Sequence, residues 1–116
     1  QYICASSGYR GLDFNYLVNQ NSCGSELYID RGKDSQDENK MIFDKLKTLE
    51  NTINEKVNYP IKWQRLDNKR ASRIRIDLDG GYKSSEEDWA SFHEIMIDAM
   101  NQLEAAIKPE LKKIKI

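Results

Sequence analysis

The chain has 116 residues, 32% of them charged, and a formal net charge of −1 at pH 7. This length is typical of one domain, and a chain of this size folds without disulfides or metal ions. The near-neutral charge excludes a uniformly basic nucleic-acid-binding protein, and no apolar run approaches the roughly 20 residues that span a bilayer. We expect residues 1–116 to be a single cytoplasmic domain, excised from a longer protein because the chain opens on Gln1 inside an apparent strand.

Three strands are predicted in the first 30 residues. An apolar run over residues 2–5 precedes a glycine-flanked bend at residues 6–11. Apolar and polar residues then alternate over residues 14–18 and 26–30, the pattern of strands with one buried face. The chain therefore begins as a three-stranded antiparallel meander.

A helix is predicted to follow this meander. Ser35 and Glu38 have the spacing of a capping box, in which each side chain bonds a free backbone N–H. An apolar stripe at steps of three and four is typical of a helix packed on a sheet: Ile42, Leu46, Leu49, Ile53 and Val57. The helix is expected to end before Pro60, since the residue preceding a proline avoids the α region.

Residues 61–78 predict two more strands joined by a polar turn, in which Asn68 takes a positive φ. Alternation places Trp63 beside Ile74 and Ile76 on one face, and we expect these three side chains to form a cross-strand core cluster. The cationic side chains of the same strands point the other way.

The last helix is predicted from a second capping pair, Ser84 and Glu87, onward. Its apolar stripe is long: Trp89, Phe92, Met96, Met100, Leu103 and Ile107. Pro109 predicts a break or kink at Lys108, with a fraying tail beyond it. The expected fold class is α+β: an antiparallel sheet of about five strands with two helices packed on one face, in the order β-β-β-α-β-β-α.

The hairpin concentrates positive charge, with six cations between residues 62 and 75 against one acid, Asp67. Cationic side chains on one sheet face favour phosphate contacts. The candidate nucleic-acid-binding residues are Lys62, Lys69, Arg70, Arg73 and Arg75. The alternative is a solvated face whose charges prevent edge pairing, and no aromatic residue is interleaved among these cations for base stacking.

Metal and cofactor chemistry finds little support in the residues. Cys4 and Cys23 are interpreted as reduced thiols of a cytosolic protein, with a disulfide as the alternative if the first strands bring them together. The single histidine, His93, leaves no Cys/His zinc set. We expect no metal site and no cofactor.

Five spaced motifs occur along the chain: ELYIDRG at 26–32, ENK at 38–40, FDxL at 43–46, WxRLD at 63–67 and RASRI at 70–74. Together they resemble domain of unknown function 4268, usually found at the C-terminus of bacterial and archaeal proteins predicted to be nucleases or restriction-type defence factors. The resemblance spans nearly the whole chain. It implies a C-terminal position and a nuclease-like N-terminal region in the parent protein, and it assigns no catalytic residue to this segment.

Two triplets have the letters of a magnesium nuclease: residues 38–40 after Asp30, and residues 67–69. Such chemistry requires the triplet on a strand beside the Asp, whereas these fall in a helix start and in a turn. We therefore expect no enzyme in this segment. A polar cluster near the strand ends is interpreted as a surface ion-pair network: Arg10, Asp30, Arg31, Arg70 and Arg73.

The leading hypothesis is a non-catalytic accessory domain of a nuclease-like or defence-related protein that contacts nucleic acid through the hairpin. The alternative is a protein-interaction or dimerisation module, because the last helix carries Trp, Phe and Met residues, which are enriched in interface cores. Its partner would be the parent protein's N-terminal domain or a second copy of the chain. No contact with a membrane is expected.

Overall fold

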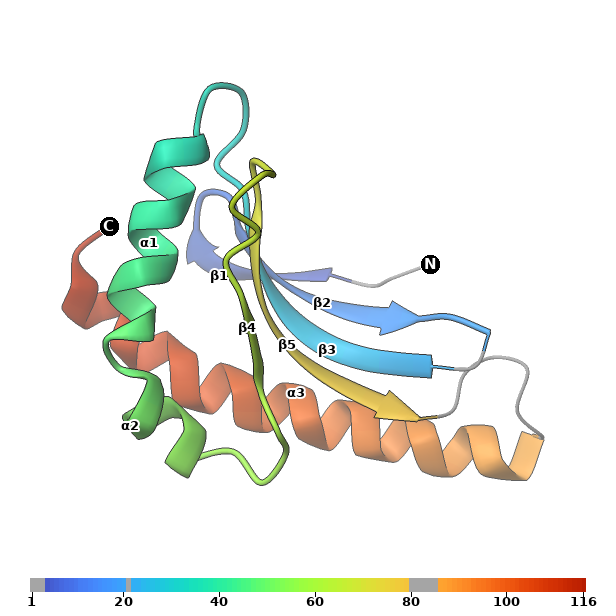
Figure 1. The fold of residues 1–116 in the computed structure, drawn as a ribbon. Coiled ribbons are helices and arrows are strands. Elements are labelled where there is room, and N and C mark those ends of the chain that lie inside the picture. Colours follow the sequence, from blue (N-terminus) through green and yellow to red (C-terminus); the bar gives the residue numbers. More distant parts are fainter. Residues whose placement is uncertain (1–3, 21, 80–85) are drawn as a thin grey trace.

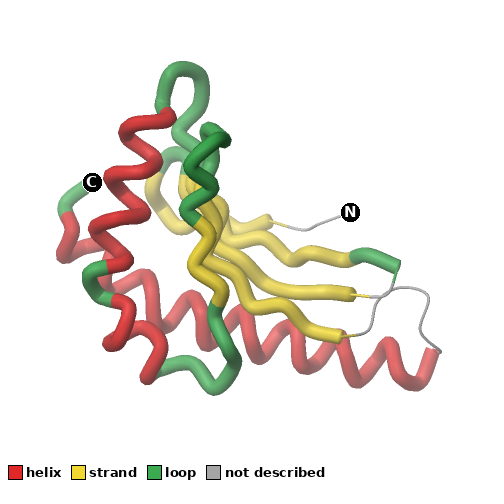
Figure 2. Tube along the Cα trace, viewed as in Figure 1, coloured by secondary structure: helices red, strands yellow, loops and turns green. Residues whose placement is uncertain are grey.

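The computed structural model describes residues 4–20, 22–79 and 86–116, which form one antiparallel sheet and three helices (Figures 1 and 2). The elements are β1 Cys4–Tyr9, β2 Leu12–Val18, β3 Ser22–Ile29, α1 Gln36–Lys47, α2 Glu50–Glu55, β4 Lys62–Gln64, β5 Ser72–Asp79 and α3 Glu86–Ile114. The five strands lie in the order β1-β2-β3-β5-β4. The predicted α+β class and five-stranded antiparallel sheet are confirmed, and the order becomes β-β-β-α-α-β-β-α because the first helix is divided.

One face of the sheet carries the hydrophobic core. Strand pairing places Phe14, Leu27, Ile74 and Trp63 in one row across four strands. The first three of these side chains are fully buried, and α1 and α3 pack over them. Figure 1 shows the strands bending along their length, with the helices on the outer side of the bend. The opposite face, which we call the open face, is not covered by any described helix.

The predicted helix over residues 35–57 is divided at Thr48 and Leu49 into α1 and α2. The Thr48 hydroxyl donates a hydrogen bond to the carbonyl of Lys45 at 2.6 Å. A side chain that bonds back to the preceding turn competes with the helical ladder and promotes a bend. The apolar stripe nevertheless continues across the break and stays buried: Ile42, Leu46, Ile53 and Val57.

The predicted capping box at the start of α1 is wrong. Ser35 occupies the N-cap but caps no backbone N–H with its side chain. Its hydroxyl donates to the carbonyl of Gly32 and accepts from Asn39 Nδ2 at 2.9 Å, while Glu38 lies 3.6 Å from Arg31 Nε. Ser35 therefore stabilises the turn that precedes the helix.

α3 runs without interruption past Pro109, so the predicted break at Lys108 is wrong. A proline at this position removes the hydrogen bond to the carbonyl of Ala105. Both residues are exposed, so water can bond that carbonyl. Leu111 is fully buried, and its packing holds the last turns of the helix in place, in contrast to the fraying that the sequence predicts.

The strand order also bears on the cysteines. β2 lies between β1, which carries Cys4, and β3, which carries Cys23. Strands separated by one neighbour are about 10 Å apart, whereas a disulfide requires Cα atoms within about 7 Å. The backbone therefore does not place the two cysteines side by side.

Some expectations concern residues that the structure does not describe. Ser84 and the side chains of Glu87 and Trp89 lie outside the described part of the chain, and with them the predicted capping pair. Among the helices that are described, none combines the length and the apolar character needed to cross a membrane.

The core row gives a stability prediction. Ile74 is fully buried between Leu27 and Trp63, so Ile74→Ala should lower the free energy of unfolding by about 2–5 kcal/mol. The matched variant is Lys62→Ala, because this side chain is 61% exposed and should contribute little. Denaturant unfolding of both variants measures the difference, and equal losses would contradict the assignment of the two faces.

Candidate nucleic-acid interface

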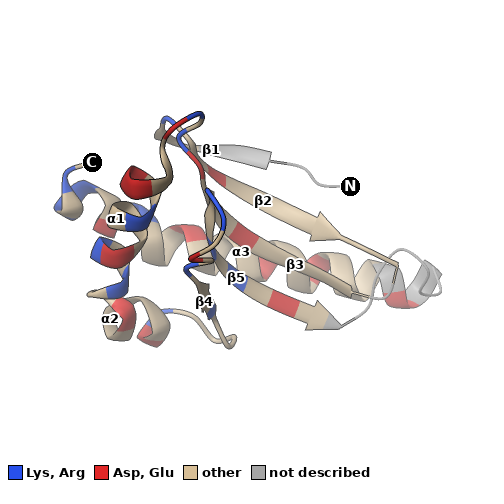
Figure 3. Cartoon of the chain, turned by 45° about the horizontal axis from the view of Figure 1, so that its top comes forward, with Lys and Arg blue, Asp and Glu red and all other residues tan. Residues whose placement is uncertain are grey.

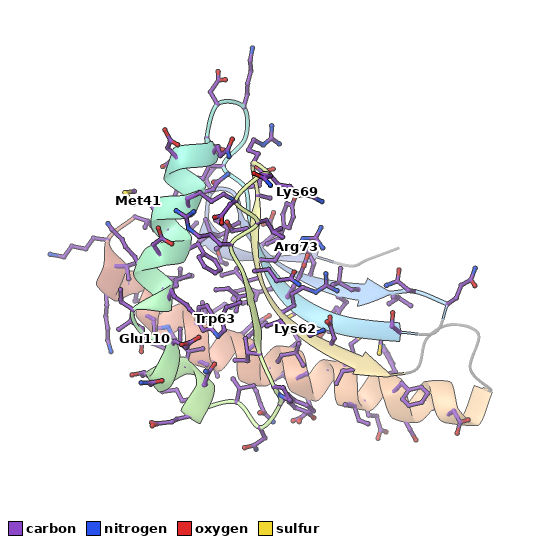
Figure 4. All side chains as sticks on the ribbon, viewed as in Figure 1. Met41, Lys62, Trp63, Lys69, Arg73 and Glu110 are labelled. Carbon is purple, nitrogen blue, oxygen red and sulfur yellow. The ribbon has the colours of Figure 1, made fainter. Side chains whose placement is uncertain are left out.

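The β4–β5 hairpin separates core and cationic side chains as predicted. The paired positions are Lys62 with Arg75, Trp63 with Ile74, and Gln64 with Arg73. Figure 4 shows Trp63 directed toward the helices, whereas Lys62 and Arg73 extend from the opposite side of the sheet. Because side chains alternate along a strand, the open face receives the cations and the core receives the apolar residues.

The connection between β4 and β5 differs from the predicted turn. It spans residues 65–71, and its positive φ of 56° belongs to Leu66 and not to Asn68. The backbone N–H of Lys69 donates to the carbonyl of Leu66 at 2.9 Å. A bulky residue rarely adopts this conformation, so other contacts must hold it.

A buried lysine of α1 provides those contacts. Lys40 is 6% exposed, and its Nζ lies 2.5–3.0 Å from four acceptor oxygens: the carbonyls of Arg65, Leu66 and Ala71 and the hydroxyl of Ser72. One of its three N–H groups is therefore shared between two of these oxygens. An ammonium has three donors and no acceptor, so this oxygen cage favours the charged form, although burial lowers the pKa of Lys40. The cage fixes the carbonyl of Leu66 toward Lys40 and thereby explains its unusual φ.

Asn39, which is fully buried, ties the same loop to the end of β3. Its Oδ1 accepts from the backbone N–H of Arg31 at 2.9 Å, and its Nδ2 donates to the carbonyl of Arg70 at 3.0 Å. The Arg70 guanidinium in turn binds Asp30 through two hydrogen bonds, of 2.8 and 2.7 Å. Two adjacent residues of α1 thus anchor both ends of the loop.

The carboxylates beside these cations have shifted pKa values. Burial alone would raise the pKa of Asp30, but the hydrogen bonds from Arg70 and from the backbone of Gly32 outweigh it and hold the pKa below its usual value. The same balance applies to Asp77, where burial is outweighed by Lys62 and a neighbouring arginine. Both acids therefore stay ionised at neutral pH and keep their cations in place.

The neighbouring strand β3 extends the open face and adds an aromatic residue. Tyr28 pairs with Arg73, and Arg73 pairs with Gln64, so these three side chains form a row. The Arg73 Cζ lies 5.1 Å from the centre of the Tyr28 ring, a cation–π distance. The expectation that no aromatic residue accompanies the cations is therefore wrong for the face as a whole, because Tyr28 reaches it from β3.

A groove of about 440 Å³ is hollowed into the open face beside the loop. Its lining residues, which we use to define the groove, are Tyr28, Asp30, Gln64, Leu66, Lys69, Arg70, Ala71, Arg73 and Arg75. Four of the five candidate nucleic-acid-binding residues are thus brought together. The fifth, Lys62, pairs with Arg75 on the same face but lies outside the groove.

Acids from elsewhere in the sequence neutralise part of this charge. Figure 3 shows acidic and basic positions interleaved over β4, β5 and their loop. The pairs of the open face, with their shortest N–O distances, are Arg70–Asp30 at 2.7 Å, Lys62–Asp77 at 2.7 Å, Arg75–Asp77 at 2.9 Å and Arg73–Glu26 at 3.6 Å. Five candidate cations therefore meet three acids, which leaves a positive surplus. Lys69 forms no ion pair with any described residue.

Glu26 is the unusual member of this set, because it is only 1% exposed although it points to the open face. Asn15 Nδ2 donates to its Oε2 at 3.2 Å, but Glu26 Oε1 and Asn15 Oδ1 accept no hydrogen bond from a described group. Side chains converge on the inner side of a bent sheet, and this crowding buries the carboxylate beneath Arg73. The ion pair with the buried Glu26 therefore holds the Arg73 side chain in position.

Within the polar cluster predicted near the strand ends, all of which the structure describes, only Arg70 and Asp30 form an ion pair with each other, whereas Arg31 and Arg73 pair with acids outside the cluster. Arg10 Nη1 donates to the carbonyl of Arg31 at 2.7 Å. The N–H of Asp30 donates to the carbonyl of Gly11 at 2.8 Å, so the β1–β2 turn lies against the same corner. A Cβ at Gly11, which has a φ of 77°, would come within 2.6 Å of the Arg31 backbone. Only glycine permits this close approach.

Asn39 and Lys40 are not among the site residues that the sequence predicts. A signal was present, since Asn39 precedes Ile42 and Leu46 at steps of three and four and so lies on the buried stripe of α1. A polar residue at such a position requires buried hydrogen-bond partners. The identity of those partners depends on the loop between β4 and β5, which is distant in sequence.

Neither nuclease-like triplet lies on a strand. Glu38 and Lys40 belong to the beginning of α1, and the Lys40 ammonium is held by the oxygen cage. The triplet at residues 67–69 lies in the loop after β4. No group of three or more His, Cys, Asp or Glu side chains within the described ranges is arranged to hold a metal ion.

These features define a small α+β domain whose antiparallel sheet carries helices on one face and a cationic groove on the other. The sequence matches the family Domain of unknown function (DUF4268) over residues 1–111, and the chain belongs to this family. No curated protein and no solved structure matches the chain significantly. The description of this family names no reaction, ligand or partner.

The oxygen cage predicts a large effect of a buried substitution. Lys40→Met should lower the free energy of unfolding by about 1–3 kcal/mol or more, because several carbonyls lose their hydrogen-bond donor. The exposed Lys112 supplies the control, and Lys112→Met should leave stability nearly unchanged. Denaturant unfolding measures both, and hydrogen exchange should be faster at residues 65–71 in Lys40→Met. Unchanged exchange there would refute the anchoring role.

The shifted pKa of Asp30 predicts a pH dependence. Because its pKa is lower in the folded than in the unfolded chain, Asp30 stabilises the fold above its unfolded pKa of about 3.9. This contribution is lost as the pH falls from about 5 through the folded pKa. Asp30→Asn should therefore reduce stability at neutral pH and flatten the acid decline in the free energy of unfolding. An acid decline as steep as that of the parent chain would contradict the assignment.

Proposed function

We propose that this chain is a non-catalytic accessory domain of a nuclease-like or defence-related protein, and that it contacts nucleic acid through the groove. The observation that carries the proposal is the convergence of Lys69, Arg70, Arg73 and Arg75 on one hollow of the open face. Guanidinium and ammonium groups are the usual partners of phosphate oxygens. The nuclease-like or defence-related setting rests on the resemblance of the motifs to a domain usually found in proteins predicted to be nucleases or restriction-type defence factors.

The ion pairs of the open face are compatible with this role. Lys62 keeps 61% of its side chain exposed, and exposed ion pairs such as Lys62–Asp77 contribute little to stability. Exchanging a carboxylate for a phosphate at such a cation therefore costs little. Lys69, which forms no ion pair with a described residue, is available without any exchange.

The alternative, a protein-interaction or dimerisation module, has weaker support from α3. Met96 and Met100 are 3% and 2% exposed and belong to the chain's own core. The exposed Ile95 and Ile97 are two residues apart, so the helical turn directs them to different sides. The described part of α3 therefore offers no single apolar patch for a partner.

A salt titration tests the proposal. If four cations contact phosphates, affinity for single-stranded DNA should fall about 50-fold between roughly 50 and 200 mM salt. Lys69→Gln with Arg75→Gln should weaken binding strongly and reduce the salt slope by about half, because two of the four contacts are lost. Fluorescence anisotropy with a labelled oligonucleotide measures both effects.

The control variant removes the same charge elsewhere. Lys112→Gln with Lys115→Gln alters two exposed lysines near the end of α3 and should leave binding nearly unchanged. Neutral replacements are preferred to glutamate because Arg73 and Arg75 lie beside the buried Glu26, where added negative charge would disturb folding. Absence of binding to both single-stranded and duplex DNA at low salt, or equal losses in the two double variants, would overturn the proposal.

A further inference from the structure

The cations of the open face differ in exposure, and this difference distinguishes between forms of nucleic acid. We propose that it takes a single strand, with one unpaired base stacked on Arg73 and Tyr28 and the adjoining phosphates on Arg75 and Lys69. This inference rests on the proposed function and names its ligand class. A duplex would reach only the rim.

The stacking platform is already assembled. Arg73 lies over the Tyr28 ring at 5.1 Å, and its side chain remains one-third exposed. Bases stack on guanidinium planes and on aromatic rings in single-strand recognition, whereas bases inside a duplex are covered by their neighbours. A guanidinium backed by a tyrosine therefore offers a binding surface that only an unpaired base can use.

The cations of the open face lie at two depths. Arg75 and Arg73 are recessed, with 21% and 33% of their side chains exposed, whereas Arg70 and Lys62 are 51% and 61% exposed. Figure 4 shows the Lys69 side chain near the tip of the hairpin and the Arg73 side chain lower on the sheet. A rigid duplex meets the outer cations, whereas a flexible single strand can bend into the groove of about 440 Å³ toward the recessed ones.

The spacing along β5 also suits a single strand. Arg73 and Arg75 are two residues apart on one face, which places their Cα atoms about 6.7 Å apart. This separation suits one nucleotide, with its base on Arg73 and its phosphate on Arg75. Gln64, next to Arg73 in the same row, supplies both an amide donor and an amide acceptor for a base edge.

The experiment compares one oligothymidylate with a duplex of equal length by fluorescence anisotropy at low salt. The test variant is Tyr28→Leu, which removes the ring and keeps an apolar side chain, and the control is Tyr28→Phe, which keeps the ring. Tyr28→Leu should weaken single-strand binding about 5- to 100-fold, the range for loss of one stacked base, and leave duplex binding unchanged. Tyr28→Phe should stay within about twofold of the parent chain.

A second pair of variants covers the case in which Tyr28→Leu does not fold. Arg75→Gln removes a recessed cation and should weaken single-strand binding more than duplex binding. Lys62→Gln removes an outer cation and should not weaken single-strand binding more than duplex binding. Thermal unfolding establishes that each variant is folded.

The outcomes separate this inference from the proposed function. Binding to neither nucleic acid overturns the proposed function itself. Duplex binding as tight as single-strand binding, or single-strand binding that is indifferent to both Tyr28→Leu and Arg75→Gln, overturns the single-strand inference and leaves the proposed function standing. Preferential single-strand binding that weakens in both variants supports the two together.

Discussion

The structure depends on a lysine ammonium held by four oxygens. Lys40 stands on α1, and all of its acceptors belong to the loop or to the first residue of β5. Burying an ammonium is unfavourable unless its hydrogen bonds are made, so the loop is stable only in a conformation that directs its carbonyls at Lys40. With Asn39 beside it, this contact fixes where the hairpin emerges from the sheet. The groove takes its shape from that position.

The bend of the sheet accounts for the difference between its two faces. On the outer side there is room for helices, and the strand residues there are fully buried beneath them. On the inner side the side chains crowd together, so Glu26 becomes buried without a helix above it. A buried carboxylate requires a nearby cation, and Arg73 lies beside Glu26 at 3.6 Å. The bend thus accounts for a carboxylate that is buried beside Arg73 on the open face.

Local patterns in the sequence were sufficient for the strands and for the faces of the hairpin. Alternation placed Ile74 and Ile76 inside and Arg73 outside, because one face of an antiparallel sheet is buried. The apolar stripes likewise identified the helices, although Thr48 interrupts the first and Pro109 does not interrupt the last. The first outcome depends on the hydrogen bond of the Thr48 hydroxyl, and the second depends on the solvent exposure of the helix side that carries Pro109. The periodicity of apolar residues predicts neither.

The candidate site was less accessible from the sequence, because its partners are far apart along the chain. Arg70 binds Asp30 forty residues earlier, and Asn39 reaches the carbonyl of Arg70 across 31 positions. Within the hairpin, the sequence contains one acid among the cations. The neighbouring strand β3 adds Glu26 and Tyr28 to the same face of the sheet. Both additions require the pairing of β3 with β5, a long-range contact that follows from the whole fold.

The ion pairs of the open face have two opposing consequences for a phosphate ligand. They lower the net positive charge, which weakens long-range attraction. They also hold long arginine side chains in defined positions, so less conformational entropy is lost when a phosphate replaces the carboxylate. Arg73, which lies between Glu26 and the Tyr28 ring, is constrained from both sides, so it likewise loses little conformational entropy when a base stacks on it. A cation prepared in this way favours a ligand that fits the groove over one that merely carries charge.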